Sequence, residues 1–158
     1  MAADKKFWLR DHLSATGRRD VRAHYERASD AVQAAFDAHW ELLEGRPRER
    51  WTRPDAAKLD PEWKGGFREF FEFRFKADNV QQRPLGFFGP DDGRFALLLW
   101  AIEKGHKFAP KEAIDTCDKR RKSILDGQAT THHWDEDEKD ESEQAGEAPP
   151  QNIPRRLR

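Results

Sequence analysis

Arg68-Glu69-Phe70-Phe71-Glu72-Phe73-Arg74-Phe75-Lys76 is the stretch of sequence that decides the fold. Phe71, Phe73 and Phe75 alternate with charged residues, and a period of two is typical of a β-strand with one apolar and one polar face. The side chains expected on the polar face are all charged: Glu72, Arg74 and Lys76. The stretch therefore predicts a strand that buries phenylalanines on one side and presents a polar working face on the other.

Two further strands follow at short intervals. The turn Ala77-Asp78-Asn79 leads into residues 80–88, where Pro84 predicts a bulge or a missing ladder hydrogen bond. Gly89-Pro90-Asp91-Asp92-Gly93 is typical of a hairpin turn, and residues 95–102 after it are apolar on both faces, as in a strand buried on both sides. Three successive strands joined by short turns predict an antiparallel meander.

Helical spacing flanks the meander on both sides. Apolar residues recur at threes and fours over residues 18–43, and Ser29-Asp30 indicates a cap that splits this stretch into two helices. Residues 6–13 favour a short strand, with a short helix as the alternative. Residues 110–125 again show helical spacing. The predicted fold class is α+β, with a small antiparallel sheet: a strand, two helices, a three-strand meander and a C-terminal helix.

Acidic residues gather at the C-terminal end of the chain. The 29 Lys and Arg residues balance 30 Asp and Glu residues, so the net charge argues neither for nor against a nucleic-acid partner. Residues 128–158 hold eight acidic and four basic residues, which leaves 22 acidic and 25 basic residues in 1–127. A segment this polar buries too little apolar area to offset its ordering entropy. We expect one domain at 1–127 and a disordered acidic tail at 128–158.

The cysteine count and the hydropathy pattern indicate the compartment. Cys117 is the only cysteine, which excludes an intramolecular disulfide and a cysteine-rich metal site and fits a reducing cytoplasm. No apolar run approaches the roughly 20 residues that a membrane-spanning helix needs, and the first residues lack the apolar stretch of a signal peptide. We therefore expect a cytoplasmic protein without a membrane partner.

Residues 67–125 carry a succession of motifs that is uncommon as a set. The motifs are Phe73-Arg74-Phe75-Lys76, Arg83 with Leu85-Gly86-Phe87-Phe88, the run from Leu97 to Lys104, and a short basic loop before Pro110 and a helix. This succession resembles the RelE/HigB toxin superfamily, and within it the phage-derived branch. In that family a strand with Glu-x-Arg precedes one with a central Arg, and an apolar strand ends in a Lys-rich loop. Gly105 stands where that loop has its second lysine.

The resemblance implies a RelE-like fold and a function. The implied function is the toxin of a type II toxin–antitoxin system, a metal-independent mRNA endonuclease that acts on the ribosome without a cofactor. The implied partners are a cognate antitoxin protein, mRNA and the ribosome. ParE-like relatives share the fold and bind DNA gyrase, so the alternative is a non-catalytic protein: a gyrase inhibitor or a phage-derived partner-binding module. The loop with Lys104, His106 and Lys107 favours RelE/HigB over ParE.

Metal-free RNA cleavage defines which residues the site needs. A base must remove the 2′ proton, an acid must protonate the 5′-oxygen, and cations must stabilise the phosphate oxygens. Arginine keeps its charge and matches phosphate as a fork, while imidazole suits acid–base work near neutral pH. The candidate catalytic residues are Arg74, Arg83, Lys104 and His106, and the candidate RNA-binding residues are Lys76, Lys107, Arg120 and Arg121.

Each candidate also has an ordinary structural interpretation. Arg74 paired with a neighbouring glutamate is a common solvated strand face. Arg83 beside a proline can be a surface cation near a bulge, and His106 can be an exposed loop residue. The basic run Lys119-Arg120-Arg121-Lys122 is typical of a solvated helix face that can also contact RNA phosphates. The site requires that Arg74 and Arg83 point to the same side of the sheet.

Overall fold

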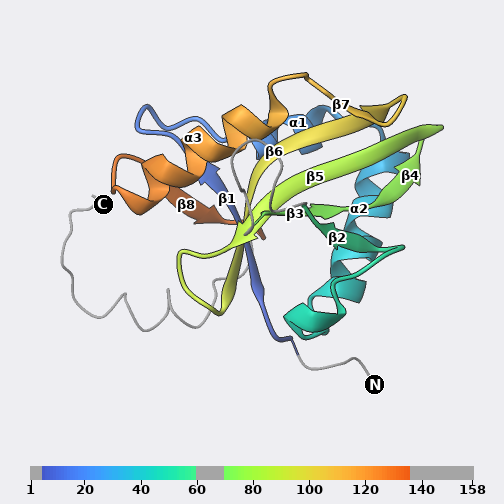
Figure 1. Cartoon of the computed structure of the whole chain (residues 1–158), viewed down its shortest axis with the longest axis horizontal. Helices are drawn as coiled ribbons and strands as arrows, with labels where there is room; N and C mark the ends of the chain where they lie inside the picture. Colours follow the sequence, from blue (N-terminus) through green and yellow to red (C-terminus); the bar gives the residue numbers. More distant parts are fainter. Residues whose placement is uncertain (1–4, 60–69, 136–158) are drawn as a thin grey trace.

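The computed structural model describes residues 5–59 and 70–135 (Figure 1). Its helices are α1 (Asp20–Arg27), α2 (Asp30–Leu43) and α3 (Ala113–Leu125), with a short 3₁₀ helix at Arg48–Arg50. Its strands are β1 (Trp8–Leu13), β2 (Ala56–Lys58), β3 (Phe70–Phe73), β4 (Phe75–Ala77), β5 (Val80–Phe88), β6 (Arg94–Lys104), β7 (Lys107–Ala109) and β8 (Thr130–His133). In this part of the chain the strands form one sheet in the order β2-β3-β5-β6-β1-β8, with β4 paired to β5 and β7 to β6.

The predicted α+β class is confirmed, and the sheet is larger than predicted. The first strand, the two helices, the meander and the C-terminal helix all form, and the Ser29 hydroxyl accepts a hydrogen bond from the Val32 N–H at 3.2 Å, as expected of a helix cap. The sheet is not purely antiparallel, because β1 runs parallel to β6. The sequence did not predict β2, β7 or β8, since runs of three or four residues hold too few alternating positions to be recognised.

The phenylalanine-rich stretch that was predicted to be one strand forms two strands, β3 and β4. Arg74 separates β3 from β4, and its backbone N–H donates to the carbonyl of Asp55 at 2.9 Å. Phe71 and Phe73 are buried in the core, and Phe75 packs against the same cluster. The predicted apolar face of this stretch is therefore confirmed, while the break turns the backbone toward the segment that precedes β2.

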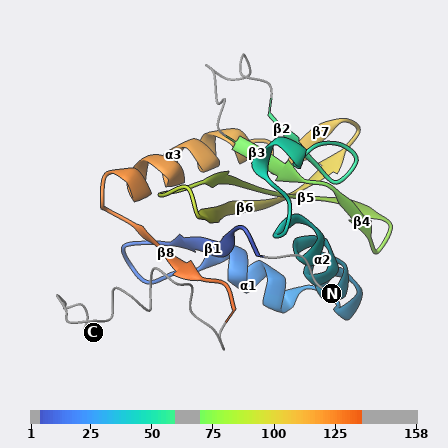
Figure 2. The ribbon, with the colours of Figure 1, turned by 90° about the horizontal axis from the view of Figure 1, so that it is seen from below.

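Helices cover both faces of the sheet. Figure 2 shows α3 on one side of the strands and α1 and α2 on the other. One core cluster packs α1 and α2 against the sheet and includes Val21, Phe36, Trp40, Phe73, Leu97 and Trp100. The second cluster packs α3 against the opposite face and includes Phe70, Leu85, Ala101, Ile114 and Cys117. None of the helices in the described ranges combines the length and the apolarity needed to cross a bilayer.

A bulge interrupts the longest strand pair, close to the proline that suggested one. Leu85 of β5 pairs with Leu99 of β6, whereas the next residue, Gly86, pairs with Leu97. β6 therefore contains one extra residue at this point, which reverses the side that its later residues face. Leu97 and Trp100, an odd number of residues apart, both belong to the core under α1 and α2.

Gly86→Ala should destabilise the fold. A Cβ atom at this position would lie 2.3 Å from the carbonyl oxygen of Ala96 and 2.7 Å from the ring of Phe95, and neither group can move without shifting β6. We expect a loss of about 1–3 kcal/mol in the free energy of unfolding, the usual range for overpacking, measured by urea denaturation. Gly93→Ala is the control, because its Cβ would meet nothing closer than 3.8 Å. Equal stability of the two variants would contradict the packing at the bulge.

Ordered structure continues past the predicted domain boundary at residue 127. β8 pairs antiparallel with β1, from Arg10↔His133 to Leu13↔Thr130. Trp134 is 4% exposed, and its backbone N–H donates to the carbonyl of Leu9 at 3.0 Å. The prediction of a disordered tail is therefore wrong for residues 128–135, because the average composition of the tail concealed a short strand and one buried tryptophan. Residues 136–158, the rest of the predicted tail, lie outside the described residues.

Trp134→Ala should lower the free energy of unfolding by about 3–5 kcal/mol, the usual cost of truncating a buried tryptophan. Its ring contacts Tyr25 and Phe36 at centroid distances of 5.2 and 5.3 Å, so the truncation would leave a void beneath α1 and α2. Thr130→Ala, at the exposed start of the same strand, should cost less than about 0.5 kcal/mol. Guanidinium unfolding of both variants tests this, and a Trp134→Ala protein as stable as wild type would show that the Trp134 ring adds nothing to the core.

Candidate functional site

A cleft of about 760 Å³ opens on the same face of the sheet as α3. Glu72 and Arg83 lie on this face, because their cross-strand partners Leu85 and Ala101 pack in the α3 cluster. The cleft takes its walls from the segment around β2, from β3 and β5, and from the β6–β7 hairpin. Its charged lining comprises the cations Arg53, Lys58, Arg74, Arg83 and Lys107, the carboxylates Glu72 and Glu103, and the imidazole of His106. Positive charge is therefore in excess.

A chain of ion pairs crosses the cleft from one strand to the next. Arg74 donates from Nη1 to Glu72, and Glu72 also lies 3.9 Å from Nε of Arg83. Arg83 Nε in turn donates to Glu103 at 2.9 Å. The order Arg74–Glu72–Arg83–Glu103 alternates the sign of the charge, so each carboxylate offsets the burial of a guanidinium.

Arg83 is the most deeply held member of this chain. Its side chain is 4% exposed, against 19% for Arg74 and 23% for Glu103. Beyond its carboxylate partners, it donates to the carbonyl of Gln82 at 2.8 Å and to the amide oxygen of Gln81 at 3.3 Å. Its donors are thus engaged by protein groups, whereas Arg74 lies closer to solvent.

The β6–β7 hairpin places an imidazole at the rim of the cleft. Gly105 and His106 both have positive φ angles, 55° and 68°, which lets a two-residue turn join Lys104 to Lys107. The side chain of His106 is 98% exposed, and its Nδ1 lies 3.8 Å from Glu103. Glu103 therefore stands between the buried guanidinium of Arg83 and an accessible imidazole.

The cleft brings together half of the residues singled out from the sequence. Arg74, Arg83, His106 and Lys107 all line it. The other four do not: Lys76 is exposed in the middle of β4, Lys104 is exposed at the end of β6, and Arg120 and Arg121 lie on α3. The structure thus satisfies the condition that Arg74 and Arg83 share one side of the sheet.

Arg120 and Arg121 hold α3 against the rest of the fold. Arg120 donates to the carbonyl of Leu98 at 2.7 Å and to Asp20 of α1 at 2.8 Å. Arg121 lies over the rings of Phe70 and Phe87, 5.9 and 5.6 Å from their centroids. An RNA-binding role for these two arginines stays a prediction, and neither of them lines the cleft.

Sequence reasoning missed four charged residues of the cleft. Glu72 and Glu103 were visible within the motifs, but only as neighbours of the basic residues. Arg53 and Lys58 belong to a stretch with no recognisable period, and they reach the cleft because β2 pairs with β3 in the register Ala57↔Glu72. A pairing of three residues leaves no signal in the sequence that could have placed them.

The turn before β2 is fixed by a single aspartate. Asp55 accepts a hydrogen bond from Arg46 on its carboxylate at 2.9 Å, and its carbonyl accepts from the Arg74 N–H. The same carbonyl lies 2.6 Å from Nε2 of His39, and since a carbonyl can only accept, that nitrogen carries the proton. Burial lowers the pKa of His39, which keeps the ring neutral while it holds this turn.

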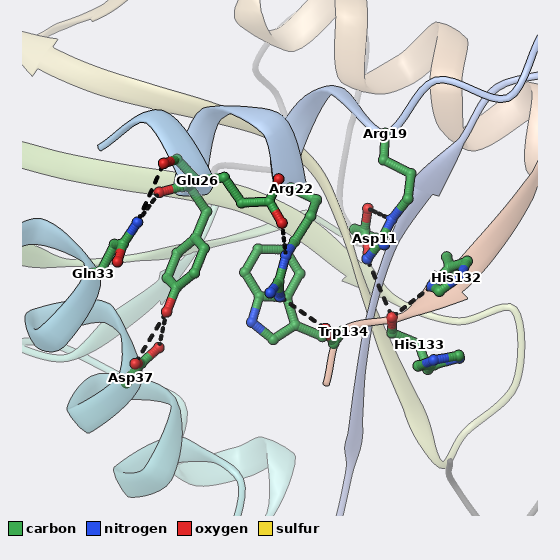
Figure 3. Close-up of polar contacts among 10 residues, drawn as sticks. Asp11, Arg19, Arg22, Glu26, Gln33, Asp37, His132, His133 and Trp134 are labelled. Carbon is green, nitrogen blue, oxygen red and sulfur yellow. Dashed lines mark hydrogen bonds and ion pairs between the residues drawn. The ribbon is translucent and has the colours of Figure 1, made fainter. Parts of the chain in front are cut away.

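A second polar network lies on the opposite face and secures α1 and β8 (Figure 3). Asp11, fully buried, accepts two hydrogen bonds from Arg19 at 3.0 and 2.7 Å, and Arg19 also donates to the carbonyl of His133 at 3.2 Å. Burial raises the pKa of Asp11 in spite of this partner. Tyr25 donates to Asp37 at 2.8 Å, and burial together with that carboxylate raises its pKa to about 12. This network is structural and does not reach the cleft.

The free energy of unfolding should fall as the pH is lowered from 7 toward 5. Burial lowers the pKa of four histidines: His12, His24, His39 and His132. Each folded pKa lies below the unfolded value of about 6.5, so the unfolded chain binds more protons as the pH falls through that value, and stability is lost.

His39→Gln isolates one of these contributions, because glutamine can still donate to the Asp55 carbonyl but does not titrate. Chemical denaturation at pH 8 should give similar stabilities for variant and wild type, and at pH 5.5 the wild type should have lost more. A constant difference between the two proteins across this range would contradict the neutral state assigned to His39.

Comparison with known proteins identifies no relative: no family model, no curated protein and no solved structure matches the chain. Function must therefore be inferred from the chemistry of the cleft. Its cations can bind an anion such as a phosphate, its carboxylates can accept a proton, and the imidazole at its rim can accept or donate one. Together these groups suit acid–base chemistry on a phosphate ester.

Proposed function

We propose that the protein is a metal-independent endoribonuclease of the RelE/HigB type, the toxin of a type II toxin–antitoxin system, with a RelE-like fold. The observation that carries the proposal is the convergence of Arg74, Arg83, His106 and Lys107 in one cleft. These residues come from three separate parts of the motif succession. A set of unrelated solvated strand faces would have no reason to converge in this way.

Arg74 is the best placed group for the phosphate. Within the described residues its bonded side-chain atom is Nη1, so Nε and Nη2 can form a fork to phosphate oxygens. Lys107 lines the same cleft and adds a second positive charge. The developing charge of the pentavalent phosphate would be stabilised by these two cations.

Arg83 is a positioning residue in this proposal. Because its guanidinium is buried and engaged by Glu103 and Gln82, we assign it the task of positioning Glu72 and Glu103. Those carboxylates are the candidates for removing the 2′ proton, and His106 at the rim is the candidate for protonating the departing 5′-oxygen. This division of labour needs no metal ion and no cofactor.

The proposal includes the setting in which the enzyme works. Its substrate is mRNA on the ribosome, in the cytoplasm, and its inhibitor is a cognate antitoxin protein. Lys76 of β4 and Lys104 at the end of β6 are exposed outside the cleft lining, where they can contact a larger RNA or ribosomal surface. Residues on the α1 and α2 face have no part in the proposed RNA-binding surface.

One observation favours the non-catalytic alternative. Both cleft carboxylates already neutralise arginines, and an ion-pair chain of this kind also suits a surface that recognises a protein partner. A ParE-like gyrase inhibitor or a phage-derived partner-binding module would use the same face without cleaving RNA. The two functions differ in the damage they cause, since RNA cleavage stops translation and gyrase inhibition breaks DNA.

Arg74→Ala should lower the rate of RNA cleavage by the purified protein about 10²–10³-fold, the usual effect of removing one group that stabilises transition-state charge. His106→Ala should lower it less, by about 10²-fold at the general-acid step. Primer extension on translated mRNA gives the rates, and circular dichroism verifies folding.

The matched control is Arg27→Ala, an exposed arginine at the end of α1, outside the cleft lining and on the other side of the sheet (Figure 2), which should retain the wild-type rate. Full cleavage by Arg74→Ala would overturn the site. A wild-type protein that leaves mRNA intact but induces DNA breaks on expression would favour the gyrase-directed alternative.

A further inference from the structure

A smaller hollow of about 320 Å³ adjoins the cleft. Arg53, Arg74, Gln81 and Arg83 line both spaces, so the two lie side by side. The remaining lining comes from Pro54 and Phe75, and among residues 5–59 and 70–135 no acidic side chain lines it. Three guanidinium groups around a space of this size form a setting for an anion, and its volume falls within the range of about 300–1,000 Å³ that is usual for ligand pockets.

Arg53 is held at the junction of the two spaces by its neighbours. Trp51 is 1% exposed, and the Asp55 carbonyl accepts from the backbone N–H of Arg74. Two backbone hydrogen bonds, from the N–H groups of Asp55 and Ala56 to the carbonyl of Thr52, close the turn around Arg53 at 3.1 Å each. The backbone on both sides of Arg53 is therefore anchored beside Arg74, while its side chain is exposed.

Arg53 differs from the other two arginines in its charge balance. Arg74 is paired with Glu72, and Arg83 is paired with Glu103. No carboxylate of residues 5–59 or 70–135 forms an ion pair with Arg53, and the nearby Asp55 carboxylate is bound by Arg46 at 2.9 Å. Arg53 thus contributes a positive charge that the described part of the protein leaves unbalanced.

We propose that this hollow is a second phosphate-binding subsite, in which Arg53 and Arg74 bind the phosphate next to the one in the cleft. Arg74 would contact both phosphates, since it lines both spaces. The inference rests on the proposed function in one respect: if the protein is an endoribonuclease, the phosphate belongs to the backbone of a single-stranded RNA. A free polyphosphate offers the same chemistry, and the experiment separates these two sources.

The test measures binding to a 2′-O-methyl oligoribonucleotide, which lacks the attacking 2′-hydroxyl and therefore stays intact. Arg53→Ala should weaken binding about tenfold and to the same degree for different sequences, because a phosphate contact carries no sequence information. The slope of log K against log salt should fall by about 0.7, the value for one phosphate contact on a single strand. Arg53→Lys should keep the slope but lose part of the affinity, since lysine retains the charge without the fork.

Arg50→Ala is the matched control, an exposed arginine three positions earlier that lines neither space, and it should bind like wild type. Titration with inorganic pyrophosphate, followed by calorimetry, is the second arm. Binding of pyrophosphate that Arg53→Ala weakens supports the subsite for phosphate in general, and an effect on the oligonucleotide alone assigns it to the RNA backbone.

The two proposals can fail separately. A wild-type protein that binds neither probe, or an Arg53→Ala protein that binds both as wild type does, overturns the subsite even if RNA is cleaved through Arg74. A protein that never cleaves RNA but loses phosphate binding in Arg53→Ala overturns the endonuclease and leaves the subsite in place.

Discussion

The buried guanidinium of Arg83 is the constraint around which the candidate site is built. A charge with 4% of its side chain exposed is tolerated only with partners that replace the lost water, and Glu72 and Glu103 supply them from the strands on either side of β5. Their position follows from register, because Glu72 pairs with Leu85 and Glu103 with Gln81, each two residues from Arg83. The register of β3, β5 and β6 therefore determines whether the Arg83 guanidinium has its two carboxylate partners.

The two faces of the sheet have different roles: one holds the aromatic core, and the other holds the candidate site. The face under α1 and α2 carries the dense aromatic core and the polar network of Asp11 and Arg19. The other face carries the apolar cluster under α3 and, beside it, the charged cleft. Because the ion pairs that close the first face and those that line the second share no residues, changes in the cleft leave the anchoring of α1 and β8 intact.

The sequence allowed the class of fold and part of the site to be predicted, for identifiable physical reasons. Long segments with a clear period, such as the phenylalanine strand and the helix at 30–43, were recognisable because their burial repeats along the chain. Arg74, between β3 and β4, and Arg83 of β5 were recognisable from their place in the motifs. Arg53 and the pairing of β8 with β1 were not, because both depend on contacts between segments far apart in sequence. The burial of Trp134 was not predicted, because a single apolar residue in an acidic stretch gives no periodic pattern.

The extra residue in β6 determines which chemistry the cleft contains. Up to Leu97 the odd-numbered side chains of this strand face α1 and α2, and after the irregularity Ala101 and Glu103 face the other way. If the strand alternated without interruption, Glu103 would point into the aromatic core and Trp100 would stand beside Arg83. Loss or gain of a single codon in this short segment would thus exchange the faces of the β6 residues that follow it, and the cleft would lose Glu103 to the aromatic side.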